Sequence, residues 1–160
     1  MSVTVDAEQG PGGISLPGAL ARGTAAGLAG ALVMTAAQAA EMRMTGRKPS
    51  MVPAKVGMKL LPVRPRRRRE RERLNWAVHF GHGLAMGSVR GAMGAAGARG
   101  PLGGAAYFAA LWGGDVMLYQ ALGIAGPPWR WSASELATDV GHKAIYAATT
   151  SLVYEALDSR

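Results

Sequence analysis

The sequence predicts an all-α fold, an integral membrane four-helix bundle whose helices pack through glycine and alanine. Four long, alanine-rich segments carry few charges, and about 20 largely apolar residues in a helix cross a bilayer. These segments lack the period-two alternation of exposed strands. In addition, 12 of the 18 lysines and arginines lie between Arg43 and Arg73, so one connecting segment carries most of the positive charge.

The first span is expected at residues 20–41, after a flexible polar tail at 1–19. Its centre, Gly23 to Ala40, has no charged residue. A cleaved signal peptide is an alternative, because "AQA" at 37–39 resembles a small-residue cleavage site. Only Arg22 precedes the apolar run as a cation, which gives a weak cationic start and favours a retained span.

Three further spans complete one domain over residues 20–156, followed by a short tail at 157–160. They are expected at 74–96, 101–124 and 133–156. Arg90 is the one formal charge from Leu74 to Ala98, and Asp115 is the one charge from Gly100 to Trp129. A water-soluble bundle remains an alternative, but it needs a polar face on each helix, and the first span has none.

Glycines recur at four-residue spacing in the first two spans, at Gly23 and Gly27 and at Gly83, Gly87 and Gly91. This spacing is typical of membrane helices whose backbones approach closely. Simple low complexity is the competing interpretation. We expect a close helix–helix contact along these residues.

Residues 42–73 are predicted to form a basic cytoplasmic loop, because positive residues stay on the cytoplasmic side of the inner membrane. Both termini then lie outside, and Trp76, Trp129 and Trp131 fall at the cytoplasmic ends of their spans. The run "RPRRRRERER" lacks the interleaved aromatics of single-strand nucleic-acid sites, which argues against nucleic acid. It suits anionic lipid headgroups, contacted by Arg66, Arg67, Arg68, Arg69, Arg71 and Arg73.

Polar residues of all four spans are candidates for one intramembrane cluster. At 1.5 Å rise per residue, those of the first, second and fourth spans reach similar depth in the cytoplasmic half. We expect His82 within hydrogen-bonding reach of Asp139 or His142, directly or through one water, if the second and fourth spans are neighbours. The candidates are Gln38, Glu41, Asn75, His79, His82, Asp115, Glu135, Asp139 and His142.

These residues have structural interpretations as well. Ser132 and Glu135 form a capping-box pattern, Asp139 and Lys143 form an i, i+4 pair, and Arg90 is placed to snorkel from a span end. Asp115 has no charged neighbour in its own span, and a buried lone carboxyl favours the neutral form.

Three uses of the cluster stay open: interhelical hydrogen bonding, passage of protons or a small solute, and a metal site. The metal site would use His79, His82, Asp139 and His142, since imidazole and carboxylate ligate Zn²⁺ or Fe²⁺. No cofactor is expected, and the sequence contains no recognisable catalytic motif.

Several stretches resemble small four-span bacterial membrane proteins of unknown function and, more distantly, the YagU-like inner-membrane proteins. They are "GLAGALVMTAAQAAE", "TGRKPSMVP", "LNWAVHFGHG" and "GPPWRWSASELATDVGHKAIY". The resemblance covers about residues 20 to 156 and implies four spans but no activity. We therefore expect a non-enzymatic membrane protein that passes protons or a small solute, or that assembles with itself or a membrane partner. The alternative is a membrane-embedded metal-dependent enzyme.

Overall fold

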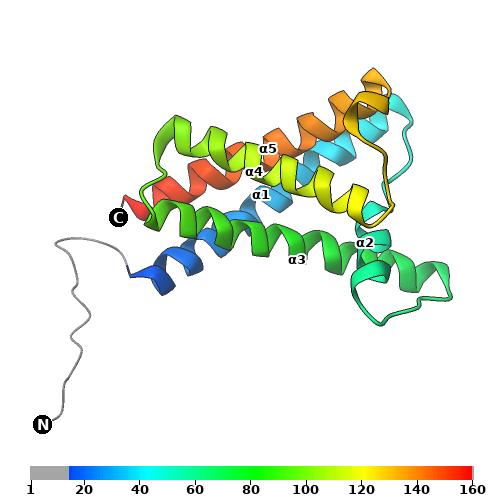
Figure 1. The fold of residues 1–160 in the computed structure, drawn as a ribbon, viewed down its shortest axis with the longest axis horizontal. Helices are drawn as coiled ribbons and strands as arrows, with labels where there is room; N and C mark the ends of the chain where they lie inside the picture. The colour runs from blue at the N-terminus through cyan, green and yellow to red at the C-terminus, as the bar shows by residue number, and fades with distance from the viewer. Residues whose placement is uncertain (1–14, 160) are drawn as a thin grey trace, which may run out of the picture.

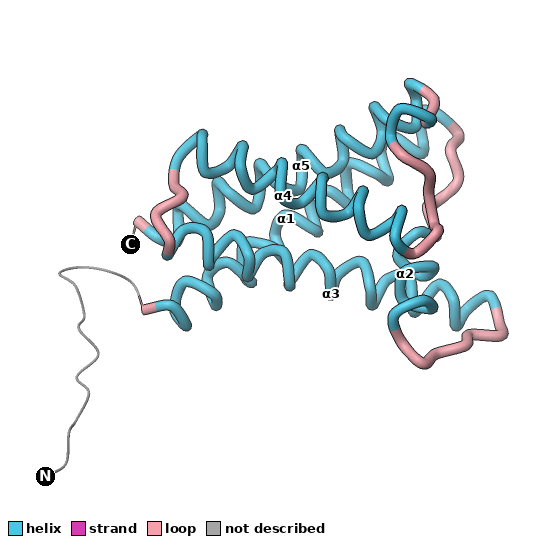
Figure 2. The backbone as a smooth tube through the Cα atoms, in the orientation of Figure 1, coloured by secondary structure: helices cyan, strands magenta, loops and turns pink. Residues whose placement is uncertain are grey.

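The chain folds as a bundle of α-helices in the computed structural model, which describes residues 15–159 (Figures 1 and 2). No strand occurs within these residues. The elements are α1 (Leu16–Thr45), α2 (Val52–Leu60), α3 (Arg68–Ala95), α4 (Gly100–Ala121), the 3-10 turn η1 (Pro128–Arg130) and α5 (Ala133–Asp158).

Local sequence explains where the helices begin and end. Proline occupies the first turn of α1, α2 and α4, where its missing N–H and fixed φ do no harm. Ser132 caps α5: its hydroxyl accepts from the Glu135 N–H, and its own N–H donates to the Glu135 carboxylate. Gly46 ends α1 at φ +71°, a left-handed conformation that glycine adopts without steric cost. The capping box expected at the fourth span is confirmed.

The four long helices run alternately up and down. α1 packs against both α3 and α5, α4 packs on α5, and α2 packs on α3 (Figure 1). The connections around α2 and η1 lie at one end of the bundle, which we call the basic end. The α3–α4 turn, the start of α1 and the end of α5 lie at the opposite end.

Glycine brings α1 and α3 into backbone contact. A Cβ on Gly87 would lie 2.7 Å from the Cα of Gly27 and closer still to the carbonyl of Gly23. A Cβ on Gly23 would meet Gly91 in the same way, 2.8 Å from its Cα. The close contact expected from the four-residue glycine spacing is confirmed.

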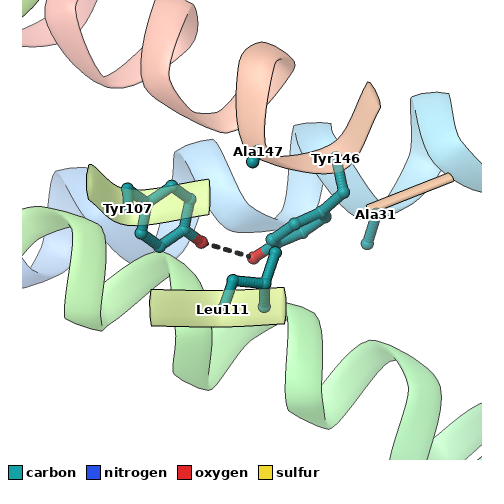
Figure 3. Close-up of a cluster of buried hydrophobic side chains, with 5 residues drawn as sticks. All are labelled: Ala31, Tyr107, Leu111, Tyr146 and Ala147. Carbon is teal, nitrogen blue, oxygen red and sulfur yellow. Dashed lines mark hydrogen bonds between the residues drawn. The ribbon is translucent and has the colours of Figure 1, made fainter. Parts of the chain in front are cut away.

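Two tyrosines fill the space between the helices. Tyr107 of α4 and Tyr146 of α5 are buried against Leu111, Ala147 and Ala31 (Figure 3). The Tyr146 hydroxyl donates to the Gly83 carbonyl of α3 over 2.6 Å. The Tyr107 hydroxyl donates to the Met86 carbonyl over 3.0 Å and lies 3.3 Å from that of Tyr146. Side chains from α4 and α5 therefore reach the α3 backbone across the core.

Helix boundaries differ from the sequence prediction in several places. The first helix continues to Thr45 instead of ending at residue 41, and α4 ends at Ala121 instead of residue 124. Residues 16–19, expected in the tail, begin α1, while residues 1–14 lie outside the described residues. The expected loop 42–73 contains α2 and the first turns of α3, which starts at Arg68, because arginine and glutamate are good helix formers. Residues 157 and 158 continue α5 instead of forming a tail.

Within the described residues, α1 is the one helix that is both long and apolar enough to cross a membrane by length and composition. The expectation of four membrane spans is therefore not confirmed, since only α1 meets this criterion among the described residues. The other three long helices, α3, α4 and α5, each contain a buried ionisable residue: Arg90, Asp115 and Lys143.

Candidate functional site

Asp115 of α4 is the centre of a buried network of charges, which we call the Asp115 network. Its carboxylate lies 3.3 Å from the Lys143 ammonium of α5 and 3.2 Å from Nε2 of His82 on α3. Lys143 also donates to both oxygens of Asp139, each at 3.0 Å. Three helices, α3, α4 and α5, thus supply one connected set of ionisable groups, whereas the sequence predicted that the polar residues of the first, second and fourth spans lie at one depth.

Two aromatic residues of α4 complete the network. The indole N–H of Trp112 donates to Asp139 over 3.0 Å. The Tyr119 hydroxyl lies 3.5 Å from Asp115, and the Lys143 ammonium lies 4.8 Å from the centre of the Tyr119 ring. A cation over an aromatic face gains electrostatic energy when it is desolvated. Lys143 therefore has two carboxylates and a ring around it.

This arrangement corrects two sequence expectations. Asp115 has two charged or chargeable neighbours, Lys143 and His82, so the expectation of a carboxyl without a charged neighbour is wrong. His82 has Asp115 as its acidic partner, and no contact of His82 with Asp139 or His142 is found among the described residues. The physical reason is helix order: α1 lies between α3 and α5 along much of their length, and α4 brings its carboxylate to His82 instead.

A second group of polar residues lies nearer the basic end, between α1 and α5. Arg47 makes a bidentate ion pair with Glu41: its Nη2 lies 2.6 Å from Oε2 and its Nε lies 3.1 Å from Oε1. Nε2 of His142 lies 4.0 Å from the same carboxylate. A shallow surface groove along these helices is lined by Ala37, Glu41, Ala137, Thr138, Gly141, His142 and Ile145.

The remaining candidates lie outside these two groups. Nε2 of His79 lies 2.9 Å from the Thr35 hydroxyl, and the Asn75 side chain accepts from the Ala54 N–H of α2. Glu135 is the capping residue described above. Gln38 is half-buried on α1, with no side-chain hydrogen bond found in the described part of the chain.

The four residues of the metal hypothesis do not form one ligand set. His79 pairs with Thr35, and His142 faces Glu41. His82 pairs with Asp115, and Asp139 with Lys143. Across residues 15–159 no three histidine, aspartate or glutamate side chains lie together in a way that could hold a metal ion.

Arg90 is a second buried charge, outside the Asp115 network. Its side chain is 0% exposed, so it does not snorkel as the sequence suggested. The guanidinium donates to Glu155 over 2.9 Å, to Ser151 over 3.1 Å and to the Ala98 carbonyl over 3.1 Å. It also lies 4.7 Å from the centre of the Tyr154 ring. Each of the three guanidinium nitrogens therefore donates to one protein acceptor.

Polar side chains of α5 thus follow the bundle core from end to end. They begin with Asp139 and Lys143, continue with Tyr146 and Thr150, and end with Ser151, Tyr154 and Glu155. Such groups can bind and release protons or exchange hydrogen bonds within the core. Sequence reasoning missed Trp112 and the central place of Lys143, although the charge of Lys143 in a largely apolar span was a usable indication.

Comparisons with known protein families, with curated protein sequences and with solved structures find no match for this chain.

Proposed function

We propose that the chain is a multi-pass protein of the cytoplasmic membrane that passes protons along its polar core. The membrane part of this proposal is supported by the outer surface of the bundle. Large apolar side chains such as Leu28, Leu32, Leu102, Met117 and Leu152 are exposed on it. The shortest of the four long helices has 22 residues, about 33 Å at 1.5 Å per residue, enough to cross ~30 Å of hydrocarbon.

The exposed positions form what we call the apolar belt. It covers residues 21–40 of α1, 76–95 of α3, 101–121 of α4 and 137–156 of α5. Exposed residues in these ranges include no aspartate, glutamate, lysine or arginine. A soluble bundle carries charge on its outer face, whereas here Arg90, Asp115 and Lys143 are inside. A polar core beneath an apolar exterior is the distribution that lipid favours.

Charge at the two ends supports an orientation with the basic end in the cytoplasm. At the opposite end Arg22 and Arg99 lie within 4 Å of Asp158, and Arg90 within 4 Å of Glu155. At the basic end, 12 lysines and arginines between Arg43 and Arg73 face few acids. Under the positive-inside rule, residues 42–73 are cytoplasmic and both termini are outside.

The single observation that supports proton passage is the row of buried ionisable and hydroxyl side chains on α5 and the helices packed against it. Protons would reach Asp139 and Asp115 from the basic end, near Glu41 and His142. The Tyr146 and Tyr107 hydroxyls continue toward Arg90 and Glu155. A larger solute is disfavoured, because Tyr107, Tyr146 and Leu111 fill the centre of the bundle.

Reconstitution into vesicles that contain a pH-sensitive dye tests proton passage. Under an imposed pH gradient the wild type should dissipate the gradient, and Asp115→Asn should slow this by roughly 100-fold, the scale of a lost proton-transfer group. Glu72→Gln is the matched control, since it makes the same chemical change at an exposed ion pair with Arg68. Equal flux in empty vesicles and in wild-type vesicles would refute proton passage.

A second candidate function, assembly with another membrane protein or a second copy, is favoured by His82. Its side chain is 41% exposed and is the one ionisable side chain of the described residues that is exposed on the apolar belt, while it contacts the buried Asp115. A polar group at lipid depth gains from a polar partner. His82→Leu would then shift the protein to a smaller assembly in detergent, and an unchanged assembly size would remove this candidate.

A further inference from the structure

We propose that the groove between α2 and the C-terminal turn of α4 binds the phosphate headgroup of an anionic phospholipid. This inference rests on the membrane location proposed above. The groove is lined by Lys55, Met58 and Lys59 of α2 and by Gly123 and Ile124, which follow α4. It lies at the basic end of the bundle, at the level where lipid headgroups would be.

The two lysines provide the charge that a phosphate needs. They are four residues apart on α2, so both ammonium groups project from one face, and both side chains are exposed. Neither takes part in an ion pair within residues 15–159. Like charges at this spacing repel each other. An anion between them would remove this repulsion, and lysine binds phosphate as a point charge.

The apolar part of the groove distinguishes a lipid from a free anion. Met58 and Ile124 lie beside the lysines, and Leu60, Leu61 and Val63 are exposed directly after them. Inorganic phosphate would contact only the ammonium groups. A phospholipid would contact the lysines with its headgroup and the apolar side chains with the upper part of its acyl chains.

α2 is held so that this face stays accessible. Its opposite face buries Ala54, Val56 and Gly57 against α3, and a Cβ on Gly57 would lie 2.8 Å from Val78. The Ala54 N–H donates to the Asn75 side chain over 3.0 Å. The groove is therefore part of the folded structure and does not depend on how the arginine-rich segment is placed.

Thermal unfolding of the full chain in detergent, titrated with short-chain lipids, tests the site. Phosphatidylglycerol should raise the melting temperature, and phosphatidylcholine or inorganic phosphate should not. The double variant Lys55→Gln, Lys59→Gln should need roughly 30-fold more phosphatidylglycerol for the same shift, about fivefold for each lysine. Arg43→Gln, Lys48→Gln is the control, because it removes two exposed charges at the same end.

Each other outcome contradicts the proposal in a distinct way. An equal loss in the control variant would mean general charge attraction without a site. An equal shift with inorganic phosphate would mean a phosphate site and not a lipid site. Recovery of the protein from the soluble fraction of cells, without detergent, would overturn both this inference and the membrane location. If the protein is membrane-bound but the lysine double variant responds to phosphatidylglycerol like the wild type, the lipid site in the groove is refuted and the membrane location is not.

Discussion

Asp115 bridges two helices because its carboxylate has Lys143 on one side and His82 on the other. Breaking a buried pair by removing one partner leaves a charge uncompensated, which costs more than the pair contributes. Here Lys143 keeps Asp139 as a second partner, so the cost should be reduced but not abolished.

We expect Asp115→Asn and Lys143→Met each to lower the free energy of unfolding by about 1–3 kcal/mol. The double variant should lose clearly less than the sum, because each change removes the interaction that the other would lose. Thermal or denaturant unfolding in the same detergent measures the free energy of unfolding of all three variants. Strict additivity would show that the two side chains are not coupled.

Arg90 should be the most sensitive arginine in the chain. Arg90→Leu leaves Glu155 and the Ala98 carbonyl without their donor and should cost about 3–5 kcal/mol of unfolding free energy. Arg99→Gln is the matched control at the same end. Its own side chain is 56% exposed, and its buried partner Asp158 also has Arg22 at 3.6 Å, so the loss should be smaller than for Arg90→Leu. Comparable losses in both variants would contradict the buried role of Arg90.

Residue-level contacts were only partly predictable from the sequence. The capping box at Ser132 and the Asp139–Lys143 pair are local, so their spacing alone predicted them. The partner of His82 depends on which helices are neighbours, and helix order is not encoded in the spacing of residues on one helix. The same reason explains why Arg90 was expected at a surface.

At the scale of helices, the α1–α3 interface is set by glycines on both sides. Gly87→Ala should destabilise the protein by about 1–3 kcal/mol, because the added methyl group would overlap the backbone of α1. Gly81→Ala on the same helix is the control, since a Cβ there meets nothing within 4 Å. It should be neutral or stabilising by up to about 1 kcal/mol, the helix propensity gain of alanine.

Melting curves of the two glycine variants, recorded side by side, check this prediction. Equal melting temperatures for Gly87→Ala and Gly81→Ala would mean that α1 and α3 do not pack through these glycines in solution.

The long helices could be predicted because each contains a long run with few charges. α2 could not, because it has nine residues and two lysines inside a strongly basic segment. The start of α3 was placed too late for a related reason. Arginine and glutamate end an apolar run but continue a helix, so hydropathy and helicity have different boundaries there.

The whole molecule has an apolar belt around buried charges, with its exposed charges near the two ends, and this is the basis of the proposed membrane location. Composition alone left a soluble bundle open, since the polar residues could have faced water. The structure describes Arg90, Asp115 and Lys143 as buried and Leu32 as 54% exposed. The proposal that lipid covers this exterior is therefore open to a direct test.

Single-cysteine labelling in intact cells is that test, because the chain has no native cysteine. We place one cysteine at Leu32 on the apolar belt, one at Ser50 at the basic end and one at Ala96 in the α3–α4 turn, all at exposed positions. An impermeant maleimide should label Ala96→Cys in intact cells and Ser50→Cys only after the membrane is permeabilised. Leu32→Cys should stay unlabelled until the protein is unfolded in detergent. Labelling of Leu32→Cys in native membranes or in a soluble fraction, as fast as Ser50→Cys after lysis, would contradict the membrane location.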